Sequence, residues 1–324
     1  MAVRRLDIGI AFLNCGITTD TSISMPKRSL MLAGGGVKIA FQAGVLQVWL
    51  DEAGFEFDHG DGVSAACFNL AMWAQGMSGR EIADNWRNLN PLRGVAINWS
   101  QLYLLFFAES IFTLDAYRHH IFPNWGLNWE KIQASRREAT FNVYNFSKHL
   151  LRPVTAPEMT EDLLVAAASL SLWFPPVRTE GDVYIDAIFN IATNLEEAIR
   201  RGADELWIIW TTSQRGQWMS GYVGAFFGIF EATTTGGYKN MLARIERNNK
   251  AVARGAGSEF GRHIKVCELK AEVPLHYLFN FSKKRTAEAV DAGVAAGRAW
   301  CKENGITYKA SDRACSSICR TAAT

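Results

Sequence analysis

Short apolar runs alternate with longer segments of helical periodicity through most of this chain. The apolar runs predict buried strands over residues 29–33, 139–146, 183–185, 204–212 and 264–269, and a further strand or turn that ends within residues 61–64. The periodic segments predict helices over residues 37–53, 65–75, 78–86, 160–172, 195–201, 239–256 and 286–304. Strands that alternate with helices are typical of a mainly parallel sheet covered on both faces. The pattern therefore predicts an α/β fold, a three-layer α/β/α sandwich.

The same pattern predicts one domain, because no internal repeat and no proline-rich linker interrupts residues 28–310. Residues 1–27 are poorly patterned and are interpreted as an N-terminal extension, and residues 311–324 as a C-terminal tail. The extension begins as a signal peptide does, but Asp7 interrupts its apolar run and no A-x-A site follows. The longest uncharged apolar stretch, residues 216–230, is shorter than the roughly 20 residues of a spanning helix.

Composition narrows the classes of protein to consider. A chain of 324 residues with 48% hydrophobic residues is neither an intrinsically disordered polymer nor a small disulfide scaffold. Its 34 basic and 32 acidic residues leave a net charge of +2, so nucleic acid is not an expected partner. Eleven tryptophans are compatible with an apolar ligand, although large cores also use aromatics. The six cysteines fall in no metal-binding spacing, and we expect a reducing, cytoplasmic location.

Three consecutive glycines, Gly34, Gly35 and Gly36, lie between a predicted strand and a predicted helix. Backbone N–H groups without flanking side chains, at the positive end of a helix, form a site for an anion. The anion is either a phosphate or the oxyanion of an acyl-transfer intermediate. The run matches neither G-x-G-x-x-G nor the P-loop pattern, and a plain tight turn remains the structural alternative.

Two further positions carry candidate chemistry. Ser64 lies in the sequence Gly62-Val63-Ser64-Ala65-Ala66, a relaxed match to the G-x-S-x-G nucleophile elbow, and helix capping explains the serine equally well. Asp186 follows the predicted strand 183–185, at the kind of strand end where α/β sheets bind ligands, and could equally be a turn former or a helix cap.

The order of these features resembles the patatin-like phospholipase family. The matching segments are LMLAGGGVKIAFQAGVLQVW, GDGVSAACFNLA, AASLSLWFPPVRTEGDVYIDAIFN and LEEAIRRGADELWIIWT. The resemblance extends from about residue 29 to residue 212, with a continuation to residue 305. It implies a patatin-like fold and a lipid acyl hydrolase of the phospholipase A or lysophospholipase type that needs no metal or cofactor.

The resemblance also implies roles for particular residues. Ser64 matches the nucleophile and Asp186 the base of a Ser–Asp dyad, and Gly34, Gly35 and Gly36 match the oxyanion loop. Lys38 lies where the family commonly has Arg or Lys. An exposed aspartate has a pKa near about 3.9 and is a weak base at neutral pH, so we expect burial to raise the pKa of Asp186. The expected intermediate is an ester of Ser64 with the fatty acid.

Three positions depart from the family pattern. Ile39, Ala66 and Ala187-Ile188 replace glycines, and Ile39 could displace the helix that follows the glycine loop. One alternative is therefore a catalytically impaired, lipid-binding relative. A second alternative is an esterase with a Ser64–Asp186–His276 triad, because His276 follows Asp186 in chain order as in ordinary α/β hydrolases.

Two aromatic stretches, residues 102–125 and 217–230, suit either an acyl-chain channel and membrane contact or an ordinary core. The basic segment 239–254 suits either anionic headgroups or a solvated helix face. The expected partners are a phospholipid or another acyl-ester lipid, with peripheral contact to a membrane surface.

Overall fold

The computed structural model describes residues 25–90, 94–104, 107–213, 215–218, 220–273, 275–278 and 282–309. Of the predicted extension only residues 25–27 are described, and the predicted tail 311–324 lies outside the described residues. Three described cysteines, Cys67, Cys267 and Cys301, carry free thiols.

The core of the molecule is a mixed sheet with the strand order β10-β9-β1-β2-β5-β8-β7, with β6 paired to β5. Its strands are β1 (Arg28–Leu32), β2 (His59–Val63), β5 (Glu138–Asn145), β6 (Leu150–Thr155), β7 (Val177–Thr179), β8 (Asp182–Asp186), β9 (Glu205–Trp210) and β10 (Lys265–Lys270). Strands β10, β9, β1, β2 and β5 are parallel, whereas β6 and β8 run antiparallel to β5. The predicted mainly parallel sheet is confirmed.

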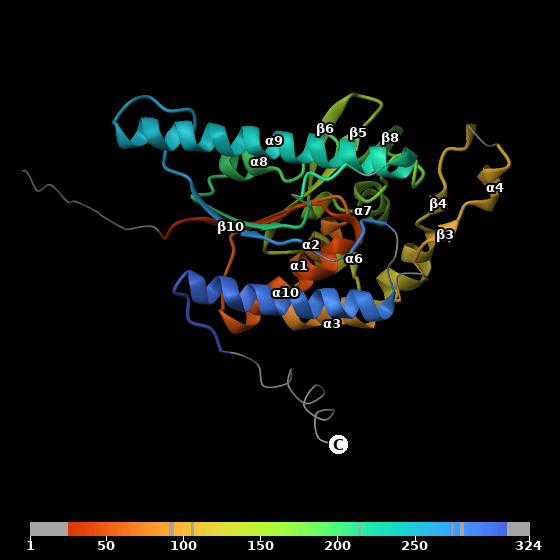
Figure 1. Cartoon of the computed structure of the whole chain (residues 1–324), viewed down its shortest axis with the longest axis horizontal. Coiled ribbons are helices and arrows are strands. Elements are labelled where there is room, and N and C mark those ends of the chain that lie inside the picture. Colours follow the sequence, from red (N-terminus) through yellow and green to blue (C-terminus); the bar gives the residue numbers. More distant parts are fainter. Residues whose placement is uncertain are drawn as a thin grey trace, which may run out of the picture.

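Helices cover both faces of this sheet, which confirms the predicted three-layer α/β/α sandwich (Figure 1). One face carries α1 (Ile39–Leu46), α2 (Ala66–Ala74), α3 (Gly79–Asn88) and α10 (Lys283–Glu303). The other face carries α8 (Leu195–Arg200) and α9 (Gly221–Ala253). Two apolar cores separate the layers, the larger around α1 and α2 and the smaller around α8 and α9.

Helix α9 is much longer than the predicted helix 239–256, because the apolar stretch 216–230 contributes its first turns. That stretch is apolar on nearly every side, so it shows no amphipathic period. None of the helices in the described ranges has an apolar window that could span a bilayer.

Helix α7 (Glu161–Ala167) is capped by Thr160 as predicted but ends before the predicted residue 172. Beyond the helix, the Ser169 carbonyl accepts a hydrogen bond from the Asp186 N–H at 3.1 Å. The hydrophobic pattern of the sequence did not predict several short elements, namely α4 (Trp99–Leu102), α6 (Trp129–Gln133), β3 (Ala96–Ile97), β4 (Phe112–Thr113), β6 and β7. Strands of two or three residues are too short for an alternating pattern, and β6 contains Pro153.

Candidate active site

Ser64 occupies a sharp turn between β2, which ends at Val63, and α2, which begins at Ala66. Its φ of +59° is in the left-handed region, which costs a non-glycine residue conformational energy and is common at functional sites. Gly62 allows α2 to pack tightly behind the turn, because a Cβ there would lie 3.2 Å from Leu70 Cδ2 and 3.3 Å from the Cys67 backbone. The turn has the geometry that the predicted nucleophile elbow requires.

Asp186, at the end of β8, is the hydrogen-bond partner of Ser64. The Ser64 hydroxyl donates to Asp186 Oδ2 at 2.6 Å, and the Ile188 N–H donates to Oδ1 at 2.9 Å. The aspartate is only 2% exposed, and burial raises its pKa to about 7 although both hydrogen bonds lower it. Near neutral pH a large fraction of this carboxyl group is therefore ionised and able to accept a proton from Ser64.

The register of the sheet explains how two residues far apart in sequence meet. Strand β6 pairs with residues 140–145 of β5 along one side. On the other side β2 pairs with residues 138–142, and β8 pairs with residues 143–145 in the opposite direction. Strands β2 and β8 therefore end against each other, with Val63 opposite Asn142 and Asp186 opposite Val143. Asp186 lies at the end of its strand as predicted, but that strand runs antiparallel to its neighbour β5.

The glycine loop lies against this pair. A Cβ on Gly34 would lie 3.0 Å from Ser64 Cβ and 2.4 Å from Ile188 Cδ1, so only glycine fits without a shift. The Gly34 N–H, however, already donates to the Ala192 carbonyl at 3.0 Å. Among the described residues, no acceptor bonds the N–H groups of Gly35 and Gly36. Of the three predicted glycines, these two have amides available for an oxyanion.

The loop is held by two neighbours that the sequence did not single out. Gly36 has a φ of +55°, and a Cβ there would lie 2.3 Å from the Tyr277 carbonyl, which also accepts from the Val37 N–H at 2.9 Å. Gly35 lies against Thr211, whose Oγ1 is 2.4 Å from the position of a Cβ. No sequence pattern connects Thr211 or Tyr277 to the glycine run.

The three departures from the family pattern fit the backbone. Ala66 is the first residue of α2, and Ala187 is not among the described residues with a positive φ, so neither position demands glycine. Ile39 is fully buried in the main core. Helix α1 still packs closely on α10, where a Cβ on Gly44 would lie 2.0 Å from the Val290 carbonyl. The steric argument for an impaired relative is therefore weakened.

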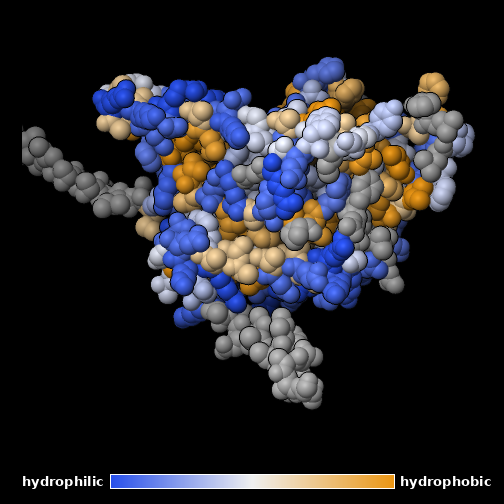
Figure 2. All heavy atoms as spheres, viewed as in Figure 1, coloured by the Kyte–Doolittle hydropathy of each residue, from blue (hydrophilic) through white to orange (hydrophobic). Residues whose placement is uncertain are grey.

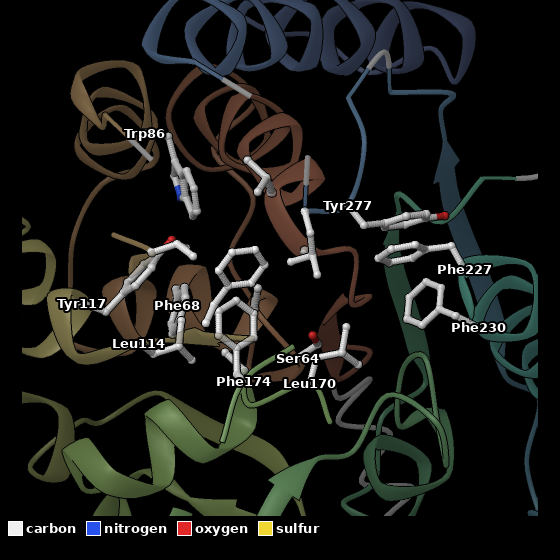
Figure 3. Close-up of a pocket in the computed structure, with 17 residues that line it drawn as sticks. Ser64, Phe68, Trp86, Leu114, Tyr117, Leu170, Phe174, Phe227, Phe230 and Tyr277 are labelled. Atoms are coloured by element: carbon white, nitrogen blue, oxygen red, sulfur yellow. The ribbon is translucent and has the colours of Figure 1, made fainter. Parts of the chain in front are cut away.

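An apolar pocket opens at Ser64 (Figure 3). Both predicted aromatic stretches contribute to it, the first through Leu114 and Tyr117 and the second through Phe227 and Phe230. Figure 3 shows these side chains on opposite sides of Ser64. Ser64 is the only residue with a side-chain hydroxyl, other than the tyrosines, among the 17 residues described as lining the pocket. The pocket suits a hydrocarbon chain.

His276 lies outside this pocket. It lines a neighbouring cavity, and its ring contacts Phe227 and Tyr277 at centroid distances of 4.7 and 6.0 Å. Burial, together with the charge of Lys38, lowers its pKa. The bonds that the structure describes for Ser64 and Asp186 do not include this imidazole.

Comparisons with known proteins bear on these features. The family model described as patatin-like phospholipase matches residues 30–199, a range that contains the glycine run, Ser64 and Asp186. Among solved structures, the chain is similar to VipD from Legionella pneumophila, at 12% identity and a TM-score of 0.40. That similarity covers 86% of this chain and 67% of the VipD chain. The search of curated proteins finds no match.

Proposed function

The chain belongs to the patatin-like phospholipase family, and from this premise we propose that it hydrolyses acyl esters of phospholipids or related lipids through an acyl-Ser64 intermediate. The observation that carries the proposal is the 2.6 Å hydrogen bond to a buried carboxylate from the hydroxyl of Ser64, which lines an apolar pocket. The hydroxyl of serine is a weak nucleophile until a base takes its proton.

In the first half of the reaction, Ser64 Oγ attacks the ester carbonyl carbon and passes its proton to Asp186 Oδ2. The carbonyl oxygen becomes an oxyanion, which the N–H groups of Gly35 and Gly36 stabilise together with that of Ala65. As the tetrahedral intermediate collapses, the bond to the leaving alcohol breaks and Asp186 returns the proton to that alcohol. The acyl group stays on Ser64 as an ester.

In the second half, a water molecule gives a proton to Asp186 and attacks the acyl carbonyl. The bond to Ser64 Oγ breaks, the serine recovers its proton from Asp186, and the fatty acid leaves. The acyl chain occupies the apolar pocket lined by Leu114, Phe174 and Phe227 during both halves. Loss of its contact with water supplies binding energy of roughly 0.8 kcal/mol per buried CH₂ group.

We place the lipid-facing surface at the aromatic end of the molecule. Trp99, Tyr103 and Phe107 are 73–87% exposed around α4, and Tyr222 at the start of α9 is 98% exposed. Figure 2 shows apolar side chains at the surface around α4. The basic half of α9 is the alternative surface, and two of its cations, Arg244 and Lys250, are already in ion pairs.

A fluorophosphonate probe tests the proposal directly, because it reacts preferentially with activated serines. Wild-type protein should be labelled and Ser64→Ala should not, while hydrolysis of a short-chain phospholipid falls by about 10³-fold or more in the variant. Absence of labelling in folded wild-type protein would instead favour a lipid-binding relative without catalysis. Labelling that persists in Ser64→Ala would place the nucleophile elsewhere.

A further inference from the structure

A second cavity, of about 350 Å³, lies beside the glycine loop and shares Tyr277 with the acyl pocket. Its lining differs from that of the acyl pocket, because it includes the charged residues Lys38, Arg215, Glu231 and Glu272. Figure 3 shows the Tyr277 ring stacked beside Phe227, with its hydroxyl pointing away from Ser64. The two cavities therefore meet at one aromatic side chain.

Lys38 is the unusual residue of this cavity. It is only 5% exposed, and its ammonium lies 4.0 Å from the centre of the Tyr277 ring. Within the described chain the ammonium has neither a hydrogen-bond acceptor nor an ion pair within 4 Å. Burial lowers the pKa of Lys38, whereas the charges of Glu231 and Glu272 raise it. A buried ammonium without an acceptor is costly, so its position facing a cavity indicates that a ligand supplies the anion.

The carboxylates of the cavity limit what that ligand can be. Glu231 accepts a hydrogen bond from the Tyr277 hydroxyl at 2.8 Å, and Glu272 lies 3.4 Å from Arg215. A simple anion at Lys38 would be repelled by Glu231, for which no ion pair is described, whereas Arg215 balances the charge of Glu272. A ligand with a phosphate at one end and an ammonium at the other satisfies both charges, because Glu231 then faces the ammonium.

We propose that this cavity binds the zwitterionic phosphodiester headgroup of a phospholipid, with the phosphate at Lys38 and the ammonium at Glu231. The inference rests on the proposed function and names the substrate class of the same site. Lys38 follows Gly36 by two residues, and the intervening Val37 N–H is bonded to the Tyr277 carbonyl. A headgroup held at Lys38 therefore orients the ester toward the loop amides.

Binding of the headgroup alone tests this inference without catalysis. Glycerophosphoethanolamine and inorganic phosphate are titrated into wild type, Lys38→Met and Lys302→Met by calorimetry. Lys302 is an exposed lysine at the end of α10, so its replacement matches the charge change at a remote site. We expect wild type to bind the headgroup at least about tenfold more tightly than phosphate, and Lys38→Met to weaken binding by about tenfold or more. Lys302→Met should bind as wild type does.

Equal binding of phosphate and headgroup would overturn the assignment in favour of a site for free anions. Unchanged binding in Lys38→Met would overturn it as well. Both variants should be checked for native melting by circular dichroism, since Lys38 is buried.

Glu231→Gln provides a second test, because glutamine keeps the shape of the side chain and can still accept from the Tyr277 hydroxyl. The ratio of kcat/KM for short-chain phosphatidylethanolamine to that for short-chain phosphatidylglycerol should fall by about tenfold. An unchanged ratio would contradict the inference. If wild type binds the headgroup but hydrolyses no lipid, the proposed function fails and the binding site stands. If wild type hydrolyses lipids but binds no headgroup, the function stands and this inference fails.

Discussion

Two buried aspartates, Asp186 and Asp61, lie close to the same serine turn but in different surroundings. Burial raises the pKa of both to about 7. Asp186 accepts from the Ser64 hydroxyl at the acyl pocket. Asp61, in β2, accepts from the Thr140 hydroxyl at 2.6 Å, the Asn142 amide at 2.8 Å and the Asn194 N–H at 3.2 Å.

The network around Asp61 continues away from the site. The Thr140 hydroxyl also bonds His59, whose pKa burial lowers to about 3, and His59 bonds Ser29. Among the described residues that line the acyl pocket, none belongs to this network. The comparison teaches that burial alone raises a carboxyl pKa, and that the partner and the access to substrate distinguish a general base from a structural acid.

The role of Asp61 is to hold the segment that follows Asp186. Asn194 caps α8, and its N–H is bonded to Asp61. Ala192, two residues earlier, bonds the Gly34 N–H. Asp61 therefore supports the position of the glycine loop but does not line the apolar pocket.

The largest expected effect is on kcat, which should fall far more on substitution of Asp186 than on substitution of Asp61. Asp186→Asn removes the proposed base and should lower kcat on a short-chain phospholipid by about 10³-fold. Asp61→Asn should lower kcat by less than about tenfold but destabilise the fold by about 1–3 kcal/mol, because an amide turned toward Thr140 and Asn142 leaves donors unpaired. Kinetics and urea unfolding of both variants measure the difference.

Equal losses of kcat in Asp186→Asn and Asp61→Asn would contradict the different roles that we assign to the two aspartates. His276→Ala is the matched control for a triad mechanism and should cost less activity than Asp186→Asn. The reverse order would favour the histidine-assisted esterase.

The next largest expected effect is a loss of activity on substitution of Gly35 in the glycine loop. Gly35→Ala should lower kcat by about 10²-fold, because the new Cβ would lie 2.4 Å from Thr211 Oγ1 and shift a loop amide. The φ of Gly35 is −179°, outside the positive region that favours glycine, so the contact with Thr211 is the cause to test. The double variant Gly35→Ala/Thr211→Ala should recover part of the activity. A double variant no better than the single one would contradict this steric explanation.

The pH dependence of activity provides a third comparison. Asp186 must be ionised to act as a base, so kcat/KM should rise with pH and level off above about pH 7. Well below that value it should fall about tenfold per pH unit. Asp61→Asn should retain the same midpoint. A midpoint that moves in this variant would indicate that Asp61 controls the reaction.

The last prediction concerns how the free energy of unfolding depends on pH. Both aspartates have folded-state pKa values above the ordinary value of 3.8, so between about pH 4 and pH 7 the folded chain holds protons that the unfolded chain has released. Their contribution to stability therefore falls as pH rises through this window. Asp61→Asn removes one of these titrations. Between about pH 5 and pH 8 its free energy of unfolding should decline less than that of wild type, by roughly 2–3 kcal/mol. An identical decline, measured by urea unfolding, would show that Asp61 does not titrate there.

Local patterns predicted much of the architecture. Apolar runs marked β1, β5 and β9 because buried parallel strands are apolar on both faces. The Ser78 cap of α3 forms the reciprocal bonds with Glu81 that its sequence favours. The first turns of α9 and the short strands had no such periodic signal and were missed.

By itself the sequence determined the alternation of strands and helices, the glycine run, the serine turn and the family resemblance, because these depend on neighbours within a few residues. Only the tertiary structure decided that β2 and β8 end against each other on β5, which brings Ser64 to Asp186. It also decided that the Gly34 N–H donates a hydrogen bond to the Ala192 carbonyl and that Lys38 lines a cavity with charged residues. Such contacts join residues distant in the chain, and burial and pKa depend on everything packed around a group rather than on its place in the sequence.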